Sequence, residues 1–195
     1  GHFSELEDPD TLVSYDSLLY AWTAISDRFP DRALGVEYGQ LVDASALGVV
    51  GVAVLNATTV GVMVERLMRF QRIADPHFRV PLERGDEISV ITMELPNGME
   101  MFVTSVVHHT RKHTDRDIAP LRVELRHAQR HPTSIYDEAW HAPVQFERPA
   151  QTLWFNSSVL DTPLLSVSPD AGRYLERYLE SMLPDEDLRK ASVSE

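Results

Sequence analysis

Two histidines four residues apart, His109 and His113, have the spacing in this chain that most suggests metal chemistry. Positions i and i+4 lie on one face of a helix, so both imidazoles could bind the same ion. Thr110 rather than a glutamate follows His109, so the zinc-protease motif is missing, and a third ligand would come from His127 or His131. The alternative is a polar helix end whose cationic side chains favour the helix dipole. We expect no metal site here and keep a small metal-dependent enzyme as an alternative.

Motifs for nucleophilic catalysis and phosphate binding are missing from the sequence. It contains no Gly-x-Ser-x-Gly elbow and no glycine-rich phosphate loop, and Ser157-Ser158 follows an expected strand end. The chain has no cysteine, which excludes disulfides, thiolate nucleophiles and thiolate metal sites. Neighbouring carboxylates lie in the polar ends of the chain, where solvation explains them. We predict a protein that is not an enzyme and needs no cofactor.

Aromatic side chains from several expected elements indicate a binding pocket instead. A small-molecule pocket has mostly apolar walls with a few polar groups. Trp154 lies on the strand face opposite Leu153 and Phe155, so it faces either solvent or a second apolar space. Taken singly, most of these aromatics are explained as plain core. The candidate ligand-binding residues are Trp22, Tyr38, Phe70, Phe102, His109 and Trp154.

Three arginines form a basic line on and beyond one expected strand, namely Arg122, Arg126 and Arg130. A guanidinium binds a carboxylate through two parallel hydrogen bonds, so a carboxylate effector could use one of them. Pairing with the abundant surface acids is the alternative, and it contributes little to stability.

Composition limits the class of protein that carries these residues. The 195 residues are 43% hydrophobic and 25% charged, which is typical of one folded domain with a real core. The net charge of −12 is unsuited to gripping phosphate backbones, because nucleic-acid affinity depends on lysine and arginine. The longest apolar run, 44–55, is too short to cross a bilayer. We expect a cytoplasmic protein with no membrane partner.

Periodicity predicts an α+β fold, a mostly antiparallel sheet covered by helices. Strands are expected as a hairpin over 78–95, with a bulge near Val90-Ile91 or cover on both faces, as a strand over 121–127, and as a second hairpin over 144–156. The segment 46–55 could be a buried strand or a buried helix. In the helix from 60 to 70, Arg66 is expected on the outer face. The other helices are expected from Thr11 to about Phe29, over 99–113 and 135–140, and from Pro169 to Leu183.

Two separated motifs give the chain a family resemblance. The first is the order R-V-x-L-x-H, a tyrosine and tryptophan in a short helix, P-V-x-F, L-x-F and L-x-x-P-L between Arg122 and Leu164. The second is L-G-x-x-G-x-A followed by T-x-G between Leu47 and Gly61. Together they resemble the effector domain of AraC-type transcription regulators, in the version named for arabinose binding. Gln129-Arg130-His131-Pro132 departs from the family's usual Pro-Ala-Pro.

The resemblance implies what the residues alone leave open. It predicts a helix for 46–55, and an effector-binding and dimerisation domain over residues 3–183. Residues 184–195 would be a linker toward a helix-turn-helix DNA-binding domain absent from this chain, through which alone DNA would be bound. The implied partners are a small-molecule effector and a second copy of the chain. A domain that only dimerises is the alternative function. The last helix, with Tyr174, Leu175, Tyr178 and Leu179, is the candidate for self-association, although we expect it rather to pack against the sheet of its own chain.

Overall fold

A computed structural model describes residues 14–43, 47–74, 79–93, 99–165 and 168–183. Within these ranges the chain forms helices and one sheet, which confirms the α+β class. The helices are α1 (Tyr15–Arg28), α2 (Leu34–Leu41), α3 (Gly48–Leu55), α4 (Val60–Ala74), α5 (Met99–Thr114), α6 (Thr133–Trp140), the 3₁₀ helix η3 (Ser157–Asp161) and α7 (Pro169–Glu180). The strands are β1 (Leu82–Glu83), β2 (Ile88–Met93), β3 (Arg122–Glu124), β4 (Val144–Gln145) and β5 (Gln151–Asn156).

The five described strands lie in the order β1-β2-β5-β3-β4, with β3 and β4 parallel and the other pairings antiparallel. The predicted 144–156 hairpin is wrong, because β3 lies between its two strands. The chain leaves β4 at the sheet edge and turns over the end of β3. Glu147 takes a left-handed φ of 55° there, and the amides of Glu147 and Arg148 donate to the carbonyls of His127 and Leu125.

The β2 strand runs without interruption along β5, from Ile88 opposite Asn156 to Met93 opposite Gln151. This continuous register excludes the bulge that the phase shift near Val90 allowed. Ile91 and Met93 face the core, each 1% exposed, whereas Val90 on the other face is half-buried. Phe78, the expected start of the hairpin, and Thr11, the expected start of the first helix, lie outside the described residues.

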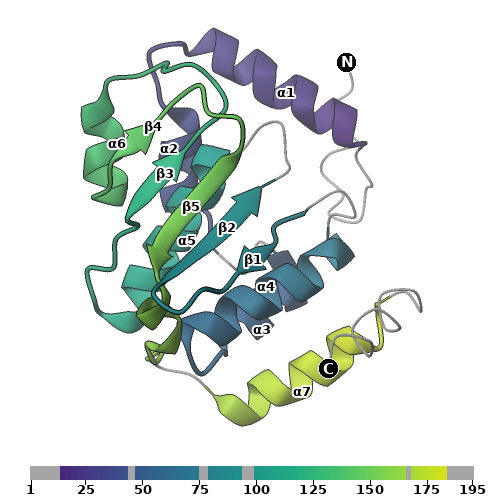
Figure 1. Cartoon of the computed structure of the whole chain (residues 1–195). Coiled ribbons are helices and arrows are strands. Elements are labelled where there is room, and N and C mark those ends of the chain that lie inside the picture. The colour runs from purple at the N-terminus through teal and green to yellow at the C-terminus, as the bar shows by residue number, and fades with distance from the viewer. Residues whose placement is uncertain (1–13, 44–46, 75–78, 94–98, 166–167, 184–195) are drawn as a thin grey trace.

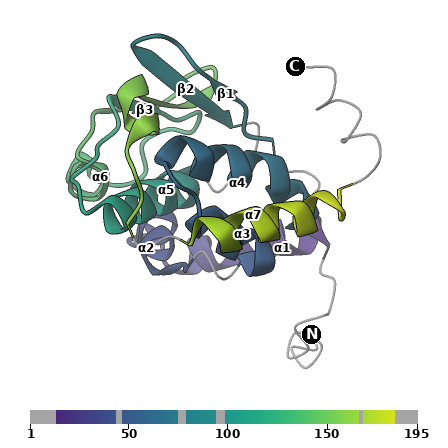
Figure 2. The ribbon, with the colours of Figure 1, turned by 90° about the horizontal axis from the view of Figure 1, so that it is seen from below.

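The helices form two layers on one side of the sheet (Figures 1 and 2). The α4 and α5 helices pack on the sheet, and α2 and α3 pack on α5 and α4. Two glycines one turn apart bring α2 against α5. A Cβ on Gly39 would lie 2.6 Å from the carbonyl oxygen of Met101, and one on Gly35 would lie 2.8 Å from Cβ of Glu100.

Helix α3 settles the ambiguous 46–55 segment in favour of the helix that the family resemblance predicts. Its buried small residues, such as Ala53, allow α4 and α7 to pack closely on it. Thr59 caps α4 by accepting a hydrogen bond from the amide of Val62 at 3.3 Å.

Arg66 on α4 is buried at 6% exposure, so the prediction that it points outward is wrong. Its Nη1 donates to the carbonyls of Ala53 and Asn56 at 3.0 and 2.9 Å, and its Nη2 donates to Glu176 of α7 at 2.8 Å. A guanidinium can be buried when carbonyls and a carboxylate accept from it. Helix α7 therefore packs on α3 and α4 rather than on the sheet, as Figure 2 shows.

Candidate functional site

A cleft of about 510 Å³ lies beneath α1, and we call it the α1 cleft. Its walls come from α1, the start of α2, the start of α5, the loop after β3 and the start of β5, at the end of the molecule where α1 crosses (Figure 1). The lining residues are Trp22, Thr23, Ser26, Asp27, Pro30, Arg32, Leu34, Gly35, Met99, Glu100, His127, Arg130, His131 and Gln151.

The sharp connection between α1 and α2 forms one wall of the cleft. The amide of Phe29 donates back to the carbonyls of Ile25 and Ser26, which ends α1, and Pro30 prevents its continuation. Arg32 then forms an ion pair with Glu37 through its guanidinium. Hydrogen bonding with Arg32 lowers the pKa of the Glu37 carboxyl, and the nearby charge of His131 lowers it further.

Glu100 occupies the floor of the cleft, in the first turn of α5, where the helix dipole favours a carboxylate. The hydroxyl of Tyr136 donates to its Oε1 at 2.7 Å, and Nε2 of His127 lies 3.5 Å from the same oxygen. Burial and the Glu100 carboxylate raise the pKa of Tyr136, so its hydroxyl stays protonated and remains a donor. Glu100 is thus held by groups of the protein itself.

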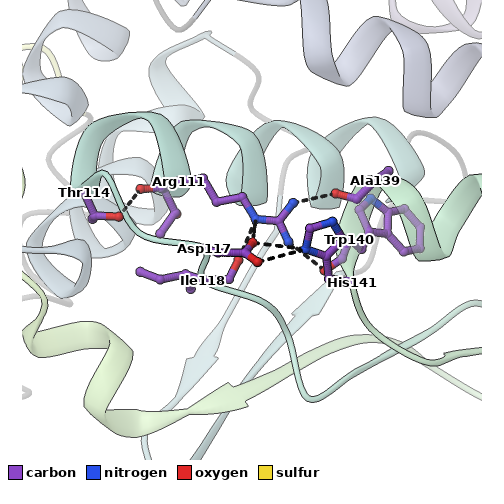
Figure 3. A network of polar contacts seen from close by, with 8 residues as sticks. Arg111, Thr114, Asp117, Ile118, Ala139, Trp140 and His141 are labelled. Carbon is purple, nitrogen blue, oxygen red and sulfur yellow. Dashed lines mark hydrogen bonds and ion pairs between the residues drawn. The ribbon is translucent and has the colours of Figure 1, made fainter.

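Helix α6 keeps Tyr136 in place because it is bonded to α5 along its length. Trp140, fully buried, donates from Nε1 to Oγ1 of Thr104 at 2.8 Å. At the far end Arg111 binds the end of α6 and the loop before β3, in a set of contacts that we call the Arg111 cluster (Figure 3). Its guanidinium donates to the carbonyls of Ile118, Ala139 and Trp140 at 2.9, 2.8 and 3.1 Å, and its Nε lies 3.1 Å from Asp117.

An arginine and a histidine of the cleft differ from these satisfied groups. Arg130 and His131 line the cleft from the loop after β3, and neither side chain makes a hydrogen bond or ion pair within the described ranges. Arg130 is exposed and His131 is half-buried. The floor beside them includes Gln151, which is 2% exposed. Arg130 and His131 thus bring to the cleft side chains that make no hydrogen bond or ion pair with the described residues.

The structure places the six aromatic candidates in different environments. Trp22 lines the α1 cleft, and Tyr38 packs edge-on against it with ring centroids 6.0 Å apart. Phe70 and Phe102 lie in the core, at 0% and 8% exposure. Trp154 lies on the other face of the sheet from the core residues Leu153 and Phe155, where the Arg122 guanidinium stacks on its ring at 3.8 Å. The six residues are not brought together around one hollow.

His109, the sixth candidate, is buried on α5 and donates through Nε2 to the carbonyl of Val42 at 3.0 Å, which fixes the end of α2. Burial lowers the pKa of His109, and the charge of His113 lowers it further. The two imidazoles are stacked, with ring centroids 5.9 Å apart. No group of three His, Cys, Asp or Glu side chains in the described part of the chain is arranged to hold a metal ion.

The three arginines of the predicted basic line, like the aromatic candidates, lie in different environments. Arg122 pairs with Glu124 at 3.2 Å as well as stacking on Trp154, and Arg126 donates to the carbonyl of Pro149 at 3.0 Å. Arg130 faces the cleft.

A second hollow is apolar and small, about 40 Å³, between α4, α5 and β5. That volume holds little more than a water molecule, so an organic ligand does not fit. The sequence led us to expect an apolar pocket, whereas the large hollow has polar and charged walls.

Several cleft residues escaped the sequence analysis or were assigned another chemistry there. Arg32, Glu100 and Gln151 lie in separate segments with no shared motif, and only the fold brings them together. His127 and His131 were considered as metal ligands. The local signal that was available is the density of cationic and aromatic residues over 127–131, where two histidines and an arginine fall in five positions.

Comparison with known proteins gives one family and one related fold. The sequence model described as "Arabinose-binding domain of AraC transcription regulator, N-term" matches residues 3–164. The fold is similar to that of the transcriptional regulator CdpR from Pseudomonas aeruginosa in its crystal structure, with a TM-score of 0.64 and 18% sequence identity. The similarity covers 86% of this chain and 56% of the CdpR chain, so the present chain spans little more than half of that regulator. No curated protein sequence matches.

Proposed function

The chain belongs to the family of N-terminal arabinose-binding domains of AraC transcription regulators, and from this premise we propose that it binds a small-molecule effector in the α1 cleft. The observation that carries the proposal is the cleft itself. Its volume of about 510 Å³ lies within the range of small-molecule sites, about 300–1,000 Å³. Polar groups from distant segments converge on it, with Trp22 as an aromatic wall.

Occupancy of the cleft would be transmitted by a shift in population between two arrangements of the domain. Helix α5 supports this route because it begins at the cleft with Met99 and Glu100 and extends about 24 Å. Near its other end the carbonyl of His113 accepts from the amide of Leu165, in the segment that leads to α7. We propose that α7 passes the change to a helix-turn-helix domain that follows the linker 184–195. DNA would be bound by that domain, as expected for a cytoplasmic regulator.

A titration tests the proposal directly. Small polar metabolites, neutral sugars included, are added while thermal unfolding is followed, because a ligand specific for the folded state raises the midpoint. Trp22→Ala should weaken the response. Tyr20→Ala removes another aromatic from α1 and serves as the matched control, since Tyr20 is 78% exposed and does not line the cleft. A panel that leaves the midpoint unchanged, or equal losses in the two variants, would contradict binding in the cleft.

The outer face of α7 favours a second candidate function, self-association. Tyr174 and Tyr178, one helical turn apart, are 65% and 50% exposed, and Met182, just after the helix, is 46% exposed. Leu175 and Leu179 face the body of the domain. We propose that this exposed row takes part in a homodimer. Sedimentation of the protein and of Tyr178→Glu tests it, and a monomer at all concentrations would rule out a domain whose role is dimerisation alone.

No helix in the described part of the chain combines the length and hydrophobicity needed to span a membrane.

A further inference from the structure

The charged side chains of the α1 cleft divide into those already neutralised and those available to a ligand. Arg32 is occupied by Glu37 through hydrogen bonds from Nε at 3.2 and 3.1 Å and a further contact from Nη2. Glu100 is occupied by Tyr136 and lies beside His127. These pairs hold the walls together and leave little capacity for binding.

Arg130 and His131 remain as cations or donors without a partner in the described part of the chain. The chain has 30 acidic and 18 basic side chains, and other arginines, such as Arg69 and Arg84, form ion pairs with glutamates. His131 lines the same cleft as Arg32, and its charge contributes to lowering the pKa of Glu37. A guanidinium presents two parallel N–H donors, the geometry that a carboxylate requires.

Asp27 of α1 provides the opposite feature on another wall of the cleft. Its carboxylate lines the cleft without a hydrogen bond or ion pair in the described residues. An ionised carboxylate is an acceptor only, so its complement on a ligand is a hydroxyl or an ammonium group.

We infer that the effector of the α1 cleft is an organic carboxylate that also carries a hydroxyl or ammonium group. Arg130 and His131 bind its carboxylate, and Asp27 accepts from its donor group. The inference rests on the proposed function and adds the chemical class of the ligand. It differs from what the family's description suggests, because arabinose is a neutral sugar with no anion for Arg130.

The experiment uses a panel of hydroxycarboxylates and amino acids, each paired with its carboxamide, together with arabinose and other neutral sugars. Binding is measured by calorimetry and by the midpoint of thermal unfolding. We expect acids to bind and their amides to bind at least about tenfold more weakly, because the amide loses the charge-assisted hydrogen bonds.

Three variants locate the contact. Arg130→Gln should weaken binding of the acid about tenfold or more while leaving binding of the amide unchanged, and His131→Asn should act in the same direction. Asp27→Asn should weaken ligands with an ammonium group more than those with a hydroxyl. Arg116→Gln is the matched control, because Arg116 is exposed, lies outside the cleft lining and makes no side-chain hydrogen bond or ion pair with the residues that the structure describes.

The outcomes separate this inference from the proposed function. Acids that bind with the expected loss in Arg130→Gln support both. Neutral sugars or amides that bind as tightly as the acids, or an Arg130→Gln variant with unchanged affinity for the acid, overturn the inference and leave a functional cleft. Absence of binding by every charged and neutral probe overturns both.

Discussion

The Arg111 cluster and the α1 cleft use the same kind of side chain for opposite purposes. Arg111 donates to three backbone carbonyls and contacts Asp117, and its side chain is 21% exposed (Figure 3). Arg130, on the loop after β3, makes no hydrogen bond or ion pair within the described ranges. A polar group whose partners are all in its own chain stabilises the fold, whereas one that is bound only to water contributes little to the fold and can exchange that water for a ligand.

The largest difference in stability between the two regions is expected for a substitution of Arg111. Replacing it by glutamine in Arg111→Gln should lower the free energy of unfolding by about 3 kcal/mol, because buried carbonyls at the end of α6 lose their donors. Urea denaturation measures the change. Arg111→Lys keeps the charge but loses the parallel N–H donors of the guanidinium. Its free energy of unfolding should therefore lie between those of the unchanged protein and Arg111→Gln. A loss below about 0.5 kcal/mol in Arg111→Gln would mean that water replaces the cluster.

Arg66, like Arg111, donates from its guanidinium to groups of the protein, and it lies in a third region, where α7 meets α3 and α4. The packing of this region can be tested at Gly172. A Cβ on Gly172 would lie 2.4 Å from the carbonyl oxygen of Asn56 and 2.9 Å from Nη1 of Arg66. Gly172→Ala should therefore destabilise the protein by about 2 kcal/mol and increase hydrogen exchange in α7.

The direction of the stability change distinguishes a packed helix from an open one. In an open helix the same substitution stabilises by about 0.5–1 kcal/mol, because glycine loses more backbone entropy on folding. A more stable Gly172→Ala variant would therefore show that α7 is not held against Asn56.

His109 is intermediate between Arg111, whose donors are occupied, and Arg130, which has no hydrogen-bond partner in the described residues. Nε2 of His109 donates to the Val42 carbonyl, while its buried Nδ1 has no partner in the described part of the chain. Burial lowers its pKa in the folded state, the charges of His113 and Lys112 lower it further, and the hydrogen bond to Val42 and the charge of Asp43 oppose the shift. The unfolded state, with a pKa near 6.5, then takes up the proton first. The contribution of neutral His109 to the free energy of unfolding is fully present above this pH, and it is lost as the pH falls below about 6.5.

The size of this pH dependence is at most about 1.4 kcal/mol per pH unit for each proton taken up. Unfolding free energies at pH 7.5 and 5.5 measure it. His113 and His108 have pKa values lowered by burial as well and add to the slope, so His109→Gln should reduce the slope without abolishing it. A slope identical in the variant would show that His109 binds its proton equally in both states.

The sequence predicted the elements of these regions better than their partners. Amphipathic stripes located α5 and α7, and turn residues located α6, because periodicity depends only on the local chain. Arg66 was misplaced because it sits beside outward-facing Glu65 on α4, and its acceptors on α3 and α7 cannot be seen from the helix itself. The 144–156 hairpin failed for the same reason, since adjacency in sequence does not reveal that β3 pairs with both strands.

The cleft was the least predictable part. Its lining combines α1, α2, α5, β5 and a loop, so no local pattern could identify it. The aromatic candidates were chosen for the apolar character of a typical pocket, which drew attention to core residues such as Phe70 and Phe102. Arg130 was one of three arginines considered for a carboxylate and it does line the cleft, but the sequence could not separate it from Arg122 and Arg126, whose partners come from other segments.

The smallest effect on stability is expected for Arg130→Gln, and it gives the most direct comparison with Arg111→Gln. Arg130→Gln makes the same chemical change as Arg111→Gln, yet it removes no hydrogen bond or ion pair between described residues. The free energy of unfolding should therefore change by less than about 0.5 kcal/mol. Urea denaturation of the two variants side by side measures the difference. A clear loss of stability in Arg130→Gln would show that this guanidinium is structural, and it would then have no capacity left for a ligand. Unchanged stability leaves its donors unused by the fold and available to whatever enters the cleft.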